Sequence, residues 1–107
     1  MANKQDQKLV AVALASEDAD YMAHLAEGYY YGRGRDRNLK LALQLWERSA
    51  ALGNADALYY SGVCRYYGDG LPRDRAAAFR LWEQAAAKGH TGAAMSLETL
   101  RGTGDND

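Results

Sequence analysis

The feature that most constrains the fold of this chain is an internal repeat of 36 residues. Residues 20–55 align with residues 56–91 without a gap, and thirteen of the aligned positions are identical. Chance at ordinary residue frequencies would give only about two or three identities. The identical pairs are Asp20/Asp56, Tyr30/Tyr66, Tyr31/Tyr67, Gly32/Gly68, Gly34/Gly70, Arg37/Arg73, Ala42/Ala78, Leu45/Leu81, Trp46/Trp82, Glu47/Glu83, Ala50/Ala86, Ala51/Ala87 and Gly53/Gly89. This period predicts stacked copies of one supersecondary unit.

Glycines recur at three positions of the repeat and predict where its helices end. Two of them follow an aromatic segment, where the chain needs positive φ to reverse, and they mark the turn within a unit. The third follows an alanine pair and marks the turn between units. These glycines are Gly32, Gly34 and Gly53 in the first unit and Gly68, Gly70 and Gly89 in the second. Each unit is therefore predicted to be a first helix, a glycine turn and a second helix.

The predicted helices span residues 18–31 and 38–52 in the first unit, and residues 56–67 and 74–88 in the second. Each second helix carries an apolar stripe of period 3.6 that includes Trp46 or Trp82. An aromatic residue that recurs on such a stripe is typical of core packing, so we favour this role over a cofactor stack. The flanking residues 5–15 and 92–101 continue the register as a preceding second helix and a following first helix.

The sequence thus predicts an all-α fold, a short right-handed α/α solenoid of about six helices, with two complete repeats and a half repeat at each end. A single proline, no isoleucine and a length of 107 residues fit one helical domain. Within residues 1–107 we expect a capping helix in 1–17, repeats in 18–53 and 54–89, a second capping helix in 90–102, and a frayed tail in 103–107.

Charge and hydropathy exclude several classes of partner. The formal net charge of −1 lacks the surplus of Lys and Arg that phosphate-backbone binding requires, so no nucleic acid is expected. The longest apolar run, residues 9–15, is too short for a membrane span or a good signal peptide. Cys64 has no second cysteine to pair with, which suits a reducing compartment. We expect a cytoplasmic protein, monomeric or a weak homodimer.

Signals for catalysis, cofactors and metals are poor. His24 and His90 occupy unrelated positions of the repeat, and Cys64 has no C-x-x-C partner. The G-R-G and G-D-G strings follow predicted helices rather than strands, so they are turns and not phosphate loops. We therefore expect no enzyme, no cofactor and no metal, although a site shared across an oligomer remains an alternative.

The repeated strings are YMAHLAEGYYYGRGRDRNLKLALQLWERSAALG and ALYYSGVCRYYGDGLPRDRAAAFRLWEQAAAKG. In both, a G-x-G turn precedes A-x-x-x-W-x-x-x-A-A-x-G. The pattern resembles the Sel1-like repeats, relatives of the tetratricopeptide repeats, over about two thirds of the chain. The family's conserved glycine in the first helix corresponds to Gly62 in the second unit, but to Ala26 in the first.

The resemblance implies protein binding and no reaction. Similar proteins serve as adaptors and assembly scaffolds, and some are cognate inhibitors of bacterial toxins. The implied partner is a protein or peptide, which includes a toxin or a secretion-system component. An immunity protein is therefore the first alternative to an adaptor. A structural protein that self-assembles through its end helices is the second.

All eight tyrosines fall in the predicted first helices, and successive helical residues point about 100° apart, so some of them must face outward. Tyrosine combines apolar area with a polar tip, a mixture common at interfaces. For Tyr29, Tyr30 and Tyr66 we favour packing within the repeat, with hydroxyls bonded to the glycine turns. The candidate contacts are Tyr21, His24, Tyr59, Tyr60 and Tyr67, together with Arg65, which differs between the units.

A basic run lies around the first glycine turn. It comprises Arg33, Arg35, Arg37 and Lys40. An acidic partner peptide could dock on this run, but a solvated loop with the interleaved aspartates Asp36, Asp69 and Asp74 is the simpler account. The sequence favours the solvated loop.

Overall fold

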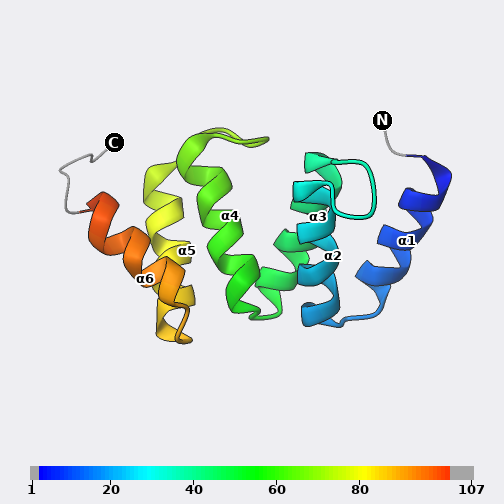
Figure 1. The fold of residues 1–107 in the computed structure, drawn as a ribbon. Helices are drawn as coiled ribbons and strands as arrows, with labels where there is room; N and C mark the ends of the chain where they lie inside the picture. Colours follow the sequence, from blue (N-terminus) through cyan, green and yellow to red (C-terminus); the bar gives the residue numbers. More distant parts are fainter. Residues whose placement is uncertain (1–2, 102–107) are drawn as a thin grey trace. The chain divides into compact units, whose positions relative to one another are not determined.

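The computed structural model describes residues 3–101, and this part of the chain is all-α, with six α-helices, a terminal π-helical segment and no strand (Figure 1). The elements are α1 (Lys4–Ala15), α2 (Ala19–Tyr31), α3 (Leu39–Ala51), α4 (Ala55–Tyr67), α5 (Arg75–Ala87), α6 (Thr91–Ser96) and η1 (Leu97–Arg101). The predicted all-α class is confirmed, and α1 to α5 begin and end within one residue of their predicted bounds, whereas the predicted helix 92–101 is divided into α6 and the π-helical segment η1. The predicted frayed tail, 103–107, lies outside the described residues.

The chain divides into two compact units, residues 1–54 and residues 55–107. Unit 1 contains α1, α2 and α3, and unit 2 contains α4, α5 and α6. The helices α2 and α4 are the first helices of the two repeats, while α3 and α5 are the second helices.

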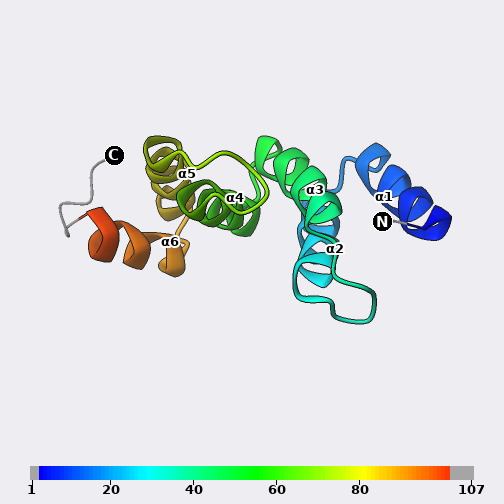
Figure 2. The same cartoon turned by 90° about the horizontal axis from the view of Figure 1, so that it is seen from above.

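In unit 1, the helices α2 and α3 lie side by side and are joined by the glycine turn, residues 32–38 (Figures 1 and 2). The helix α1 packs on α3 and on α2. Trp46, Tyr29, Met22 and Leu45 are fully buried, as the apolar stripes of the two helices require. The core of unit 1 therefore lies between α2 and α3 and is covered on one side by α1.

In unit 2, α4 and α5 form the equivalent pair, and α6 packs on α5. Trp82 and Cys64 are fully buried, and Trp82 lies among the rings of Tyr66 and Phe79, at 5.5 and 5.9 Å between centroids. The Trp82 indole N–H donates a hydrogen bond of 3.0 Å to the carbonyl of Tyr59. A Cβ on Gly62 would collide with this indole, so the glycine makes room for the bond.

The glycine turns of the two units have the same backbone. Gly32 and Gly68 both have φ of 71°, and the glycines two residues later also have positive φ. In unit 1 the Arg33 amide donates to the Gly28 carbonyl at 2.9 Å, and the Asn38 amide donates to Tyr29 at 2.8 Å. The corresponding bonds of unit 2 have the same lengths. These bonds satisfy carbonyls that the helix end leaves without partners.

Helix starts repeat with the same period. The side chain of Asn38 accepts from the Leu41 amide at the start of α3, and Asp74 does the same for Ala77 at the start of α5. Such N-caps satisfy one of the free amides of the first turn. The local signals that place the helices are therefore present in both units.

Candidate functional site

The predicted contact residues of unit 1 lie on α2. Tyr21 is 39% exposed, and its amide is capped by the Asp18 side chain at 3.0 Å. His24 lies one turn further along the helix and is also exposed. Tyr31, at the end of α2, is 45% exposed. Sequence reasoning did not select Tyr31, although it is the third of three consecutive tyrosines and at least one of these had to face outward.

The predicted contact residues of unit 2 lie on α4 and differ widely in exposure. Tyr67 is 65% exposed, the most open of the tyrosines. Tyr59 and Tyr60 are half-buried and meet edge to face, with 5.3 Å between ring centroids. Tyr59 also stacks on His90 at 4.7 Å. Arg65 is half-buried, and its carbonyl accepts the Asp74 amide of the turn. The Tyr59 ring therefore contributes to packing as well as to the surface.

Tyr29 and Tyr66 are buried, and Tyr30 is half-buried. The Tyr29 hydroxyl donates to Asp6 Oδ1 of α1 at 2.9 Å, and this bond links α2 to α1, a partner that the sequence did not predict. Burial raises the pKa of the Tyr29 hydroxyl, and the Asp6 carboxylate adds to the rise, whereas Arg35 opposes it. Tyr29 is therefore held in its neutral form as an interhelical anchor.

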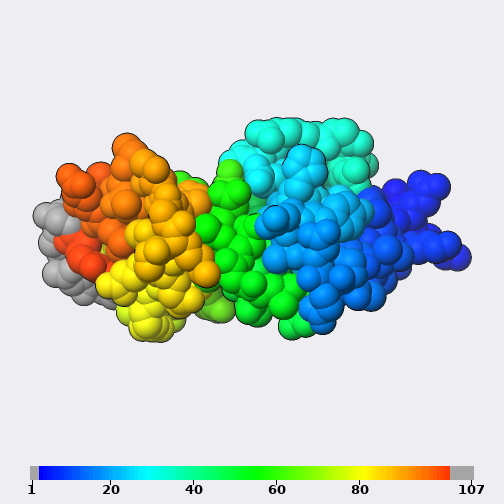
Figure 3. All heavy atoms as spheres, turned by 90° about the horizontal axis from the view of Figure 1, so that it is seen from below, coloured from blue at the N-terminus to red at the C-terminus, as the bar shows by residue number. Residues whose placement is uncertain are grey.

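The basic run of unit 1 folds back on the end of α2. Each of three consecutive tyrosines has a guanidinium group of the turn over its ring, with 4.4 to 5.5 Å from the guanidinium carbon to the ring centroid. This distance lies in the range of cation–π contacts. The pairs are Arg33 on Tyr31, Arg35 on Tyr29 and Arg37 on Tyr30. In the space-filling view, the cyan residues of this turn form a raised rim beside α2 (Figure 3).

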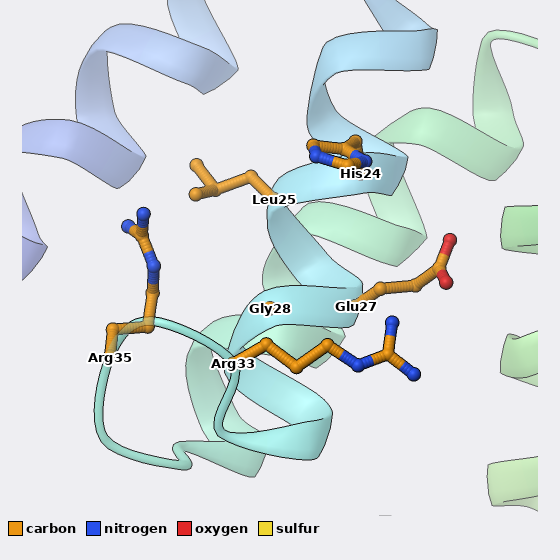
Figure 4. Close-up of a pocket in the computed structure, with 6 residues that line it drawn as sticks. All are labelled: His24, Leu25, Glu27, Gly28, Arg33 and Arg35. Atoms are coloured by element: carbon orange, nitrogen blue, oxygen red, sulfur yellow. The ribbon is translucent and has the colours of Figure 1, made fainter.

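Two of these arginines border a pocket of about 160 Å³ on α2. Its lining residues are His24, Leu25, Glu27, Gly28, Arg33 and Arg35. Figure 4 shows Gly28 between two groups of side chains, with Arg35 on one side of the helix and Arg33 and Glu27 on the other. The pocket brings the predicted His24 together with residues of the basic run. Sequence reasoning treated these two features separately.

The positions that line this pocket all differ between the units. Their counterparts in unit 2, 36 residues later, are Tyr60, Ser61, Val63, Cys64, Asp69 and Leu71. This set has no cation, and an aspartate replaces Arg33. The side chains that line the pocket are therefore specific to unit 1, and the repeated fold does not require them.

A second repeated link joins each first helix to the residue three positions after the end of the second helix of the same unit. Asn54 Nδ2 donates to Asp20 Oδ1 at 2.8 Å, and His90 Nε2 lies 2.9 Å from Asp56 Oδ1. His90 also accepts from the Ala93 amide through Nδ1, which assigns the proton to Nε2. His90 is thus a helix cap in the position of Asn54, and this role gives it a structural explanation.

Within residues 3–101, no group of three or more His, Cys, Asp or Glu side chains is placed to hold a metal ion. Over the same range, no helix is both long enough and apolar enough to cross a membrane.

Comparison with known proteins agrees with this architecture. The sequence matches the Sel1 repeat family over residues 19–54 and 55–90. A Sel1 repeat protein from Oxalobacter formigenes has 24% sequence identity and a TM-score of 0.77, and the match covers 84% of this chain and 37% of that one. No curated protein matches the sequence.

A second solved structure is a protective antigen of uropathogenic Escherichia coli strains that displays an SLR fold. It has 25% identity and a TM-score of 0.70, and the match covers 74% of this chain and 17% of that one. The chain therefore spans well under half the length of either structure. The two matched repeats cover most of the chain, and their helix pairs and glycine turns are those described above. The chain belongs to the Sel1 repeat family of all-α repeat solenoids.

Proposed function

We propose that this chain is a non-catalytic interaction module that binds a partner protein or peptide through the tyrosine-bearing helices α2 and α4. Sel1 repeats commonly mediate protein–protein interactions. The observation that carries the proposal is the exposure of Tyr21, Tyr31 and Tyr67 on these two helices. An exposed tyrosine ring offers a large contact area at low entropy cost, together with a hydroxyl for hydrogen bonding.

The test begins with co-purification of the chain from its host and identification of the bound protein by mass spectrometry. The affinity of the recombinant pair is then measured for Tyr67→Ala and Tyr21→Ala. Because interface tyrosines are frequent hot spots, at least one variant should weaken binding by about tenfold or more. Met95→Ala is the matched control, since Met95 is 62% exposed but lies on α6. Unchanged affinity for all the exposed tyrosine variants would contradict the proposal.

The identity of the partner decides between an adaptor and an immunity protein. If the partner is a toxin, co-expression of this chain should relieve its toxicity, and the exposed tyrosine variants should restore that toxicity. We place the chain in the cytoplasm because its buried Cys64 has no second cysteine in the sequence to pair with, which suits a reducing compartment. Recovery from an oxidising compartment in cell fractionation would contradict this placement.

Self-assembly is a second candidate, which exposed apolar side chains on the terminal helices favour. Val12 on α1 is 58% exposed, and Met95 on α6 is 62% exposed. If these side chains mediate stacking, the mass measured by light scattering should rise with concentration, and Val12→Ser should suppress the rise. A mass that stays constant would leave the interaction module as the function.

A further inference from the structure

We propose that the pocket over Gly28 in unit 1 receives an acidic segment of the partner, which crosses α2 and places carboxylates on the arginines at either side. This inference rests on the proposed function and names the chemistry of the partner at one site. The pocket is formed by residues of a single unit, so it does not depend on any other part of the chain.

Arg33 and Arg35 have the positive charge that such a partner needs, and they share the pocket with one carboxylate, that of Glu27. Neither Arg33 nor Arg35 forms an ion pair within residues 3–101. They stand on opposite sides of Gly28 (Figure 4), which favours a segment with two acidic residues over a single anion. The ionised residues of the pocket are these arginines and Glu27, so its net charge is positive with His24 neutral.

Both guanidinium groups are held in place before any partner arrives. Arg33 lies over the Tyr31 ring at 4.4 Å, and Arg35 lies over the Tyr29 ring at 5.2 Å. A ring contacts the face of a guanidinium and leaves N–H groups along its edge for a carboxylate. Since the side chains are already restrained, less entropy is lost when the paired hydrogen bonds form.

Gly28 opens the floor of the pocket. A Cβ at this position would lie 3.5 Å from the Arg33 carbonyl oxygen and 3.7 Å from Arg35 Nε, which is ordinary van der Waals contact. The glycine is therefore not required for packing, and its φ is not in the positive range that favours glycine. Its effect is to leave space in which a peptide backbone can approach the helix closely.

Unit 2 shows that the fold does not need these residues. Its turn has the same hydrogen bonds and the same glycine conformation, yet Cys64, Asp69 and Leu71 stand in the positions of Gly28, Arg33 and Arg35. The basic pocket is thus an addition to the repeat, and its charge points to an acidic ligand.

The first experiment is an NMR titration of the isotope-labelled full chain with two blocked peptides, Gly-Glu-Gly-Glu-Gly and its Gln counterpart. The Glu peptide should shift the amide resonances of Gly28, Arg33 and Arg35, and added salt should reduce the shifts. The Gln peptide should leave these resonances in place. Absent shifts, or equal shifts with both peptides, would overturn the proposal.

Variants then separate the pocket from general charge. Arg33→Gln and Arg35→Gln should each weaken binding of the Glu peptide by about tenfold. Arg80→Gln removes the same charge from an exposed position on α5 and should have no effect. Gly28→Ala should weaken binding while it stabilises the helix, because alanine is the better helix former. Equal loss in Arg80→Gln, or full binding in Gly28→Ala, would contradict a built site.

The natural partner distinguishes this inference from the function on which it rests. If Tyr67→Ala weakens the complex but Arg33→Gln and Arg35→Gln do not, the interaction module stands and the acidic-segment site is wrong. If the arginine variants weaken the complex and no tyrosine variant does, the tyrosine surface is wrong and the pocket stands.

Discussion

The glycine turns of unit 1 and unit 2 have the same backbone conformation but carry opposite charges at equivalent positions. Gly32 and Gly68 have the same φ, and the turn amides donate to the same helix positions at the same distances. On this backbone, unit 1 presents Arg33 where unit 2 presents Asp69. The backbone bonds and the glycines therefore define the repeat, while the side chains between the glycines are available for recognition.

The cores of the two units differ in a second way. Position 26 of unit 1 is a buried alanine, and its counterpart in unit 2 is Gly62. Where the methyl group is missing, the Trp82 indole reaches the Tyr59 carbonyl and donates a hydrogen bond. The contact of the tryptophan with a tyrosine ring is common to both units, at 5.1 Å between the centroids of Trp46 and Tyr30 and 5.5 Å between those of Trp82 and Tyr66. Gly62 thus makes room for the Trp82 hydrogen bond in unit 2, on top of a ring contact that both units share.

The largest expected effect tests this difference. Gly62→Ala should destabilise the chain by about 3 kcal/mol, because the new methyl displaces Trp82 and breaks its hydrogen bond. Ala26→Gly should cost only about 1 kcal/mol, mainly through the lower helix propensity of glycine. Chemical denaturation gives both values. A neutral or stabilising Gly62→Ala would show that helix propensity outweighs the tryptophan contact.

The shared turn should respond equally in both units. Gly32→Ala and Gly68→Ala should each cost about 1 to 2 kcal/mol, since an L residue at φ of 71° is strained. Gly28→Ala is the control, because Gly28 lies in α2 without positive φ. Thermal denaturation of the three variants checks the comparison. Unequal losses of stability in Gly32→Ala and Gly68→Ala would mean that the two turns do not contribute equally to the stability of the fold.

Each unit contains a buried serine, and substitution of the two serines by alanine should change the stability of the chain differently. Ser49 Oγ donates to the Ala19 carbonyl at 2.6 Å, so Ser49→Ala should cost about 1 kcal/mol. Ser61 is buried, and its hydroxyl has no hydrogen-bond partner among the described residues. Ser61→Ala should therefore be neutral or slightly stabilising in urea denaturation. A loss at Ser61 as large as that at Ser49 would refute this assignment.

The smallest expected effect is a loss of stability at alkaline pH, and it should arise from Tyr29 in unit 1. The folded pKa of Tyr29 is raised above 10.0, so the unfolded chain loses this proton first as pH rises. The contribution of Tyr29 to stability is full below pH 10.0 and is lost as the pH passes through the folded pKa. Denaturation midpoints should fall less with alkaline pH in Tyr29→Phe than in the wild type. Parallel pH profiles would contradict the role of Tyr29.

The architecture could be predicted from the sequence because it follows local rules that the repeat states twice. Glycine turns, cap residues and the tryptophan stripe each act over a few residues, and together they place the four helices of the two repeats within one residue. The candidate site was only partly predictable. His24 and the basic run were selected for separate reasons, and nothing in their spacing shows that the turn returns over Gly28.

The missed residues depend on tertiary contacts. The bond from Tyr29 to Asp6 joins residues of two different helices, and its partner cannot be read from the repeat. Tyr31 was passed over although one tyrosine of the consecutive three had to face outward. His90 could have been identified, because it occupies the register of Asn54, but a histidine suggests chemistry before it suggests a helix cap.

The turn that reverses each repeat also has a consequence for engineering. Its chain path is set by two glycines and by main-chain hydrogen bonds at either end. The segments 33–36 and 69–72 are therefore equivalent inserts on one scaffold, and either can be grafted into the place of the other. Exchange of these short segments would change the surface charge of both units, while the net charge of the protein would stay at −1.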